Sequence, residues 1–213
     1  MALRRVYFIN ENKVKFQNFN IKWNSGFSIQ QKQKNIEELH FCISKYYNVC
    51  KDKILEVSTA SKNELGRMLS SFTLKVFFNG HYYPLECVYQ SSKVFKNVFG
   101  EYQVLEVLNM DPRSAKKRLT VENHNTLIKF KCFDKEFSLK PSYLFYDWLY
   151  ISAVKNIPYL SESLNKYDFF TDIEFNPEKS LSCQARTLVL FIWLLRNNKL
   201  EEYIKNPNYF YRK

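Results

Sequence analysis

Residues 66–93 read GRMLSSFTLKVFFNGHYYPLECVYQSSK, and this stretch predicts a loop, a strand, a tight turn and a helix, in that order. The apolar run over residues 72–78 is expected to form the strand. Asn79-Gly80 then supplies the positive φ angles that a hairpin turn requires. Pro84 suits the first turn of the helix, because the N–H that it lacks would be unpaired there.

Three polar side chains follow on the predicted helix. Glu86, Gln90 and Lys93 are spaced i, i+4 and i+7, which places them on one helical face. A carboxylate, an amide and an ammonium on one stripe suit a charged, sugar-like ligand. An alternative explanation is that a first-turn carboxylate interacts with the helix dipole, and that Gln90 and Lys93 belong to a solvated face. The spacing alone leaves both explanations open.

Two more pairs of polar residues lie toward the carboxyl end. Asp172 and Glu174 alternate with apolar residues, as in an edge strand, or else form an acidic pair at the mouth of a site. Gln184 and Arg186 stand at the start of a very apolar helix. They either cap this helix, or they lie beside the backbone N–H groups of its first turn, which would then bind an anion. Both pairs are candidates for ligand contacts.

The composition favours one soluble domain with a sizeable core. The chain has 213 residues, of which 46% are hydrophobic and 25% charged, so extensive disorder is not expected. Only four glycines occur, which argues against a glycine-rich nucleotide loop. The net charge of +11 favours polyanionic partners, namely nucleic acid, a nucleotide-containing substrate or an anionic membrane, although a scattered excess of basic residues also serves solubility.

Cysteine usage and hydropathy predict a cytoplasmic protein. Five cysteines without a C-x-x-C pair or a nearby histidine indicate reduced thiols, with neither a disulfide framework nor a metal site. The amino terminus has too short an apolar run for a signal peptide, and the apolar runs elsewhere are too short to cross a bilayer. No membrane partner is expected.

Periodicity along the chain predicts a single compact α+β unit in which helices dominate. Strands are expected at 3–9, 19–23 and 54–58, an extended or looped segment at 169–175, a β-hairpin or an irregular insert at 127–137, and a turn at 123–125. Helices are expected at 28–48 and 102–110, from residue 111, from residue 141, and at 183–196.

The central motif is similar to the signature of the NADAR family, the YbiA-like N-glycosidases. The residues that carry the resemblance are Gly66, Leu69-Ser70-Ser71-Phe72, Gly80, Tyr83-Pro84, Glu86, Tyr89-Gln90, Lys93 and Phe95. Pro112 with Ser114-Ala115-Lys116 resembles a later Pro-x-x-Ala-Lys helix of the family. The likeness extends over about residues 59–198. Residues 1–58 have no counterpart in the minimal family, so we expect an amino-terminal extension packed on a NADAR-like domain at 59–213.

The resemblance implies a mostly helical α+β domain with a small sheet that hydrolyses a bond between ribose and an amine nitrogen without a cofactor. Family substrates include ADP-ribosylated guanine in nucleic acid. By removing ADP-ribose from this base, such members reverse the modification made by DarT-like transferases and so act as an antitoxin or counter-defence. The substrate class is therefore ADP-ribosylated nucleic acid or an ADP-ribose derivative. Other members cleave ribosylamino intermediates of riboflavin synthesis, which is the second possibility.

The resemblance also implies roles for individual residues. Glu86 would stabilise the cationic sugar and activate water, while Lys93 would form any covalent adduct with the opened sugar. Asp172 would complete the catalytic set and orient ribose hydroxyls. The residues expected to bind substrate are Arg67, Ser70, Ser71, Phe72, Tyr89, Gln90, Gln184 and Arg186, with Arg67, Arg186 and Lys116 meeting the diphosphate.

Two non-enzymatic possibilities remain at this point. A catalytically inactive module would bind ADP-ribose or a nucleotide without turnover. A plain nucleic-acid-binding protein would bind unmodified strands tightly and with a steep salt dependence.

Overall fold

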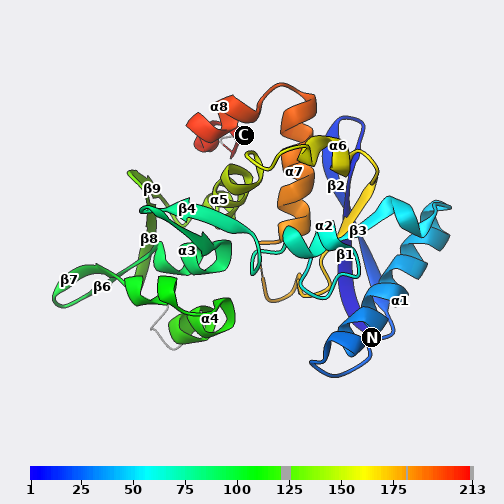
Figure 1. Ribbon diagram of the computed structural model, residues 1–213, viewed down its shortest axis with the longest axis horizontal. Helices are drawn as coiled ribbons and strands as arrows, with labels where there is room; N and C mark the ends of the chain where they lie inside the picture. Colours follow the sequence, from blue (N-terminus) through cyan, green and yellow to red (C-terminus); the bar gives the residue numbers. More distant parts are fainter. Residues whose placement is uncertain (121–125, 181, 212–213) are drawn as a thin grey trace.

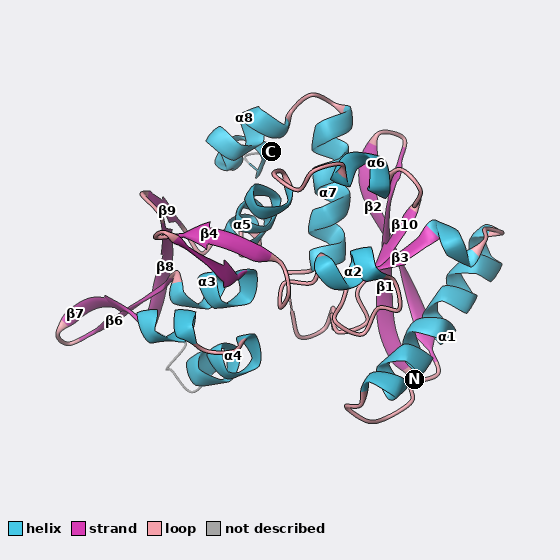
Figure 2. Ribbon diagram, in the orientation of Figure 1, coloured by secondary structure: helices cyan, strands magenta, loops and turns pink. Residues whose placement is uncertain are grey.

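The computed structural model describes residues 1–120, 126–180 and 182–211. The fold is α+β, as predicted. Helix α7 (Gln184–Arg196) separates a four-stranded sheet from a second group of elements that contains the other two sheets (Figures 1 and 2). One buried cluster joins both groups, since it includes Tyr7, Val88, Tyr150 and Leu188. Within the described residues, no helix combines the length and hydropathy needed to span a bilayer.

The four-stranded sheet has the order β2-β1-β10-β3. Its strands are β1 (Ala2–Asn10), β2 (Lys13–Ile21), β3 (Ile54–Glu56) and β10 (Phe169–Thr171). Strand β1 is antiparallel to β2 and β10, and β10 is parallel to β3. The segment 1–58 thus supplies three of these strands, while the division into an extension and a catalytic domain stays a prediction.

Helix α1 (Ile29–Tyr47) covers this sheet and confirms the helix predicted at 28–48. Leu39 and Ile43 on its apolar face are fully buried. The Ser28 side chain accepts a hydrogen bond from the Gln31 N–H, and Asn48 ends the helix in the left-handed region. Both ends are therefore determined locally by the sequence.

The central motif folds as a hairpin followed by a helix. Strands β4 (Lys75–Phe78) and β5 (His81–Pro84) are joined by Asn79 and Gly80, whose φ angles are 48° and 84°. This confirms the predicted turn. The predicted strand begins three residues later than expected, because the Ser70 carbonyl accepts hydrogen bonds from the N–H groups of residues 73 and 74.

The predicted placement of Lys93 on the helix is wrong. Helix α3 (Leu85–Ser91) ends before it, and Lys93 opens strand β6 (Lys93–Asn97). The hydroxyls of Ser91 and Ser92 both donate to the Val88 carbonyl, at 3.0 and 2.7 Å, and such local bonds compete with helix continuation. Glu86 and Gln90 do share the predicted helical face.

The third sheet has the order β7-β6-β8-β9, with β7 (Gly100–Gln103), β8 (Leu127–Cys132) and β9 (Lys135–Phe137). The segment 127–137, expected to be a hairpin or an irregular insert, forms the hairpin. The helix predicted at 102–110 is wrong: β7 pairs with β6, and a short 3-10 helix, η2 (Leu105–Asn109), follows it. The turn predicted at 123–125 lies outside the described residues.

The remaining helices complete the core. The predicted aromatic helix is α5 (Leu144–Val154), which begins three residues later than expected, and the helix predicted from residue 111 is α4 (Pro112–Thr120). The segment 169–175, expected to be extended or looped, forms strand β10 only as far as residue 171. The short helices are η1 (Lys51–Lys53), α2 (Glu64–Met68), α6 (Leu160–Leu164), α8 (Leu200–Lys205) and η4 (Pro207–Tyr211).

Gly66 allows α2 to approach β3 closely. A Cβ atom at this position would lie 2.0 Å from the backbone oxygen of Glu56 and 2.6 Å from Ser61 Oγ. We therefore expect Gly66→Ala to destabilise the fold by about 3 kcal/mol, although alanine is the better helix former. Thermal unfolding should show a midpoint lowered by roughly 6–12 °C. The surface variant Glu64→Ala is the control; equal midpoints for the two variants would contradict this packing.

His40 makes stability depend on pH. Its Nε2 lies 2.9 Å from Thr171 Oγ1, and burial, with a smaller contribution from Lys51, lowers its pKa to about 4. The unfolded chain therefore binds an extra proton between about pH 6.5 and 4, so stability falls as the pH drops through this range.

On going from pH 7 to pH 5, we expect the free energy of unfolding of the wild type to fall by about 2 kcal/mol more than that of the His40→Gln variant. The glutamine side chain keeps a neutral hydrogen-bond donor at this position but does not titrate. Urea unfolding at the two pH values measures the difference. Identical losses would show that His40 is not buried in its neutral form.

Candidate functional site

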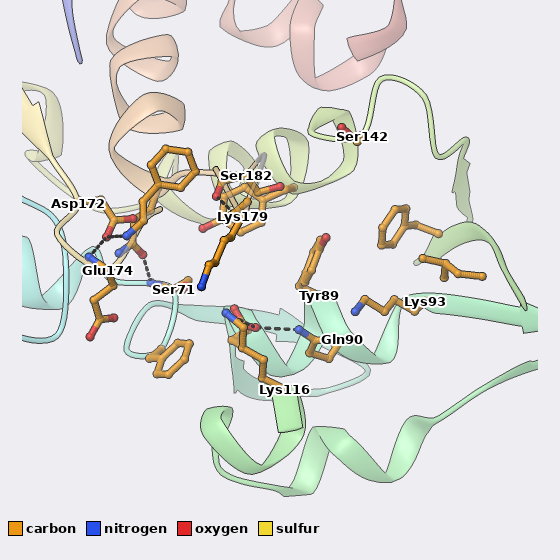
Figure 3. A pocket seen from close by; sticks show the side chains of 18 of the residues that line it. Ser71, Tyr89, Gln90, Lys93, Lys116, Ser142, Asp172, Glu174, Lys179 and Ser182 are labelled. Carbon is orange, nitrogen blue, oxygen red and sulfur yellow. Dashed lines mark hydrogen bonds and ion pairs between the residues drawn. The ribbon is translucent and has the colours of Figure 1, made fainter. Parts of the chain in front are cut away.

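A cavity of about 540 Å³ opens between α3 and the segment that follows β10 (Figure 3). Its walls come from six regions of the chain: the loop before β4, helix α3 with the start of β6, helix α4, strand β8, residues 139–146, and residues 172–184. The residues predicted as site residues that line it are Ser71, Phe72, Glu86, Tyr89, Gln90, Lys93, Lys116, Asp172 and Gln184. The structure thus brings together most of the predicted set.

Glu86 lies in the wall of this cavity and is only 5% exposed. Its Oε1 accepts a hydrogen bond of 2.8 Å from Gln90 Nε2, and Lys116 Nζ lies 4.0 Å from the same oxygen. The Glu86 backbone N–H donates a hydrogen bond to the Ser71 carbonyl at 3.0 Å. This bond holds the start of α3 against the loop that precedes β4. The carboxylate is therefore held in one orientation at the cavity.

Gln90 has a free acceptor at the same wall. Its Nε2 is used by Glu86, whereas its buried Oε1 has no hydrogen-bond partner among the described residues. A buried amide oxygen without a donor is costly, so such atoms usually meet a ligand or water. Gln90 is therefore suited to accept a hydrogen bond from a bound hydroxyl or amine.

Three lysines place positive charge around the cavity: Lys93, Lys116 and Lys179. Burial lowers the pKa of Lys93 and the Lys116 charge acts in the same direction, whereas Glu86 opposes them. Lys93 Nζ lies 5.7 Å from the ring centroid of Tyr89. Lys179 was not singled out in the sequence; it belongs to the segment after β10, and its side chain extends into the cavity in Figure 3.

Asp172 forms part of the opposite wall. Its Oδ1 accepts hydrogen bonds from the backbone N–H groups of Glu174 and Phe175, at 3.1 and 3.2 Å. Burial raises the pKa of Asp172 well above its usual value, and the carboxylates of Glu56 and Glu174 act in the same direction. A protonated Asp172 would be able to donate a hydrogen bond as well as accept one.

Gln184 connects the two walls through its side-chain amide. Oε1 accepts from the Ser71 N–H at 2.8 Å, and Nε2 donates to the Val57 carbonyl at 2.5 Å. This amide is thus engaged by the protein itself, and it holds Ser71 in place at the edge of the cavity.

A family model described as DarT1-associated NADAR antitoxin matches residues 2–213. The chain belongs to this family. The NADAR resemblance seen in the motif is thereby confirmed, and the antitoxin role is tied to DarT1. Because the match begins at residue 2, the family also covers the segment for which the motif showed no counterpart. The sequence has no significant similarity to the curated proteins with which it was compared.

Three predicted binding residues of this NADAR antitoxin do not line the cavity. Arg67 Nη1 donates to the backbone oxygens of residues 61 and 62, both at 2.9 Å. Ser70 is buried within the loop between α2 and β4. Arg186 forms an ion pair with Asp147 and its guanidinium lies 4.6 Å from the ring centroid of Tyr143. The lysines named above are therefore better placed than these arginines to contact an anionic group in the cavity.

Aromatic side chains pack together along one part of the cavity wall. The Tyr89 ring stacks on Phe145 at 5.7 Å and lies 5.5 Å from both Phe130 and Tyr146. Burial raises the pKa of Tyr89 and Tyr146, so both phenols stay neutral. In the part of the chain that is described, no cluster of three His, Cys, Asp or Glu side chains is arranged to hold a metal ion.

Proposed function

We propose that this NADAR antitoxin hydrolyses the N-glycosidic bond between ribose and base in ADP-ribosylated nucleic acid, with guanine as the first candidate base. The reaction would restore the base and so undo the modification made by a DarT1-type transferase. The observation that carries this proposal is the nearly buried Glu86 carboxylate, oriented by Gln90 at a cavity with three lysines.

The proposed chemistry needs one well-placed carboxylate. The bond from the anomeric carbon to the base nitrogen breaks, and its electron pair leaves with the base, whose nitrogen takes up a proton from solvent. The sugar carbon becomes positively charged, and the Glu86 carboxylate stabilises it through space. Water then adds to this carbon while Glu86 accepts a proton from it and later releases that proton to solvent, giving ADP-ribose and the unmodified base, which stays in its strand.

The other cavity residues suit the rest of the ligand. Gln90 Oε1 and Asp172 can bind ribose hydroxyls, and Lys116 and Lys179 supply positive charge for the diphosphate. The net charge of +11 favours a substrate attached to nucleic acid, because additional phosphates add sequence-independent attraction.

The test is incubation of the protein with an oligonucleotide that carries ADP-ribosyl-guanine, followed by mass analysis. We expect intact ADP-ribose and the unmodified oligonucleotide, at a rate that falls with rising salt. Binding of ADP-ribose without turnover would support an inactive module. Salt-insensitive turnover of a small ribosylamine alone would indicate the riboflavin-type reaction, and tight binding to unmodified strands alone would indicate a plain nucleic-acid-binding protein.

Lys93 offers a second route to the same products, because its lowered pKa increases the fraction of neutral amine. The amine would add to the sugar carbon before water does. Cyanoborohydride during turnover separates the routes. We expect an unmodified protein mass, since Glu86 is the better-oriented group; an ADP-ribose adduct on Lys93 would assign the step to lysine.

A further inference from the structure

Asp172 is flanked by two residues that both bind one buried carboxylate. Glu56 Oε2 accepts a hydrogen bond from Thr171 Oγ1 at 2.6 Å, and Glu56 Oε1 accepts one from the Ile173 N–H at 2.9 Å. Glu56 itself is 3% exposed and Thr171 is fully buried. The carboxylate therefore fixes the backbone immediately before and immediately after Asp172.

The sheet register explains this arrangement. Strands β3 and β10 run parallel, and Thr171 lies directly opposite Glu56. His40 of α1 adds a contact of 2.9 Å between its Nε2 and Thr171 Oγ1. Because the single hydroxyl proton of Thr171 goes to Glu56, His40 is the donor in this contact. Arg4 of β1 donates from Nε to the Ile173 carbonyl at 3.0 Å.

All three supporting side chains lie in the segment 1–58, on β1, α1 and β3. We propose that Arg4, His40 and Glu56 are positioning residues that hold Asp172 in the cavity wall through Thr171 and Ile173. The inference rests on the proposed function, because it assigns these residues a part in the reaction at the same cavity. It gives this amino-terminal segment a role in that reaction as well as in the fold.

The physical basis is the rigidity of a buried polar network whose members satisfy one another. Asp172 uses its Oδ1 to accept from the Glu174 and Phe175 N–H groups, so the turn after β10 has one arrangement. Loss of the Thr171 hydroxyl would leave Glu56 Oε2 and His40 Nε2 without this partner, and the backbone beside Asp172 would shift. A misplacement of about 1 Å at a reacting group can cost up to roughly 10²-fold in rate.

The test is a double-mutant cycle between Thr171 and Asp172, with release of ADP-ribose from the modified oligonucleotide as the readout. Thr171→Val removes the hydroxyl at nearly constant shape, and we expect kcat to fall about tenfold or more. Thr171→Ser restores the hydroxyl and should stay within about twofold of wild type. In a protein that already carries Asp172→Asn, adding Thr171→Val should lower kcat no further, because the effect of the Thr171 hydroxyl passes through Asp172.

A merely structural role of Thr171 would give a different result. The fold-decrease in kcat of the double variant would then equal the product of the fold-decreases of Thr171→Val and Asp172→Asn. That outcome, or full activity of Thr171→Val, would overturn the proposal. Thermal unfolding checks that each variant is folded.

Crystal structures of the wild type and of Thr171→Val give a readout that needs no turnover. We expect the Asp172 carboxylate of the variant to lose one or both of its hydrogen bonds to the following N–H groups. An unchanged carboxylate would overturn the positioning role. A wild type that releases no ADP-ribose would instead overturn the proposed function, and the two failures are thus distinguishable.

Discussion

Replacing Glu86 by glutamine should slow the release of ADP-ribose by about 10³-fold. The amide has nearly the shape of the carboxylate but carries no charge, so it can neither stabilise the cationic sugar nor take a proton from water. Its oxygen can still accept the hydrogen bond from Gln90, and the three lysines are untouched. We therefore expect ligand affinity to change little. Single-turnover kinetics and calorimetry with ADP-ribose measure the two quantities separately.

The matched control for this prediction is Glu106→Gln. Glu106 pairs with Arg118 at 3.3 Å, its side chain is 59% exposed, and it does not line the cavity. The same chemical change there should leave the rate within about twofold. Retention of more than about a tenth of wild-type activity by Glu86→Gln would remove Glu86 from the chemical step.

Replacing Asp147 by alanine should destabilise the fold by about 4 kcal/mol. Asp147 is fully buried on α5, and both of its carboxylate oxygens accept hydrogen bonds from Arg186 Nη2. It also accepts one from Thr187 Oγ1 at 2.6 Å. Without the carboxylate, the guanidinium loses this counter-charge in a site largely closed to water, and α5 loses its polar link to α7.

Thermal unfolding should place the midpoint of Asp147→Ala roughly 8–16 °C below that of the wild type. Asp134→Ala is the control, because Asp134 is exposed in the turn between β8 and β9. If the two variants unfold at the same midpoint temperature, the Asp147–Arg186 ion pair contributes no net stability. Arg186 would then be available for a ligand.

Local chemistry explains which parts of the fold are predictable from sequence. The Asn79-Gly80 turn and the ends of α1 depend on residues within a few positions, so their structure follows from their residue types. Lys93 could not be placed in this way. Its position depends on hydroxyl bonds within α3 and on pairing of β6 with β8, whose residues lie more than thirty positions away.

The candidate site shows the same division. Glu86 and Gln90 form a hydrogen bond because they are one helical turn apart, and this spacing can be read from the sequence. Lys179 enters the cavity only because the segment after β10 returns to α3, and no motif marks it. Arg186 was expected near the ligand, but its partner Asp147 lies 39 positions earlier and is invisible to spacing arguments.

The most direct test of the proposed reaction is a crystal structure of Glu86→Gln bound to an oligonucleotide that carries ADP-ribosyl-guanine. We expect the anomeric carbon of the modified ribose in the cavity, within about 3.5 Å of the residue 86 side chain or of a water bound to it. The diphosphate should lie against Lys116 and Lys179. An anomeric carbon outside the cavity, with only the adenosine end bound inside it, would contradict the assignment of Glu86 to the glycosidic bond.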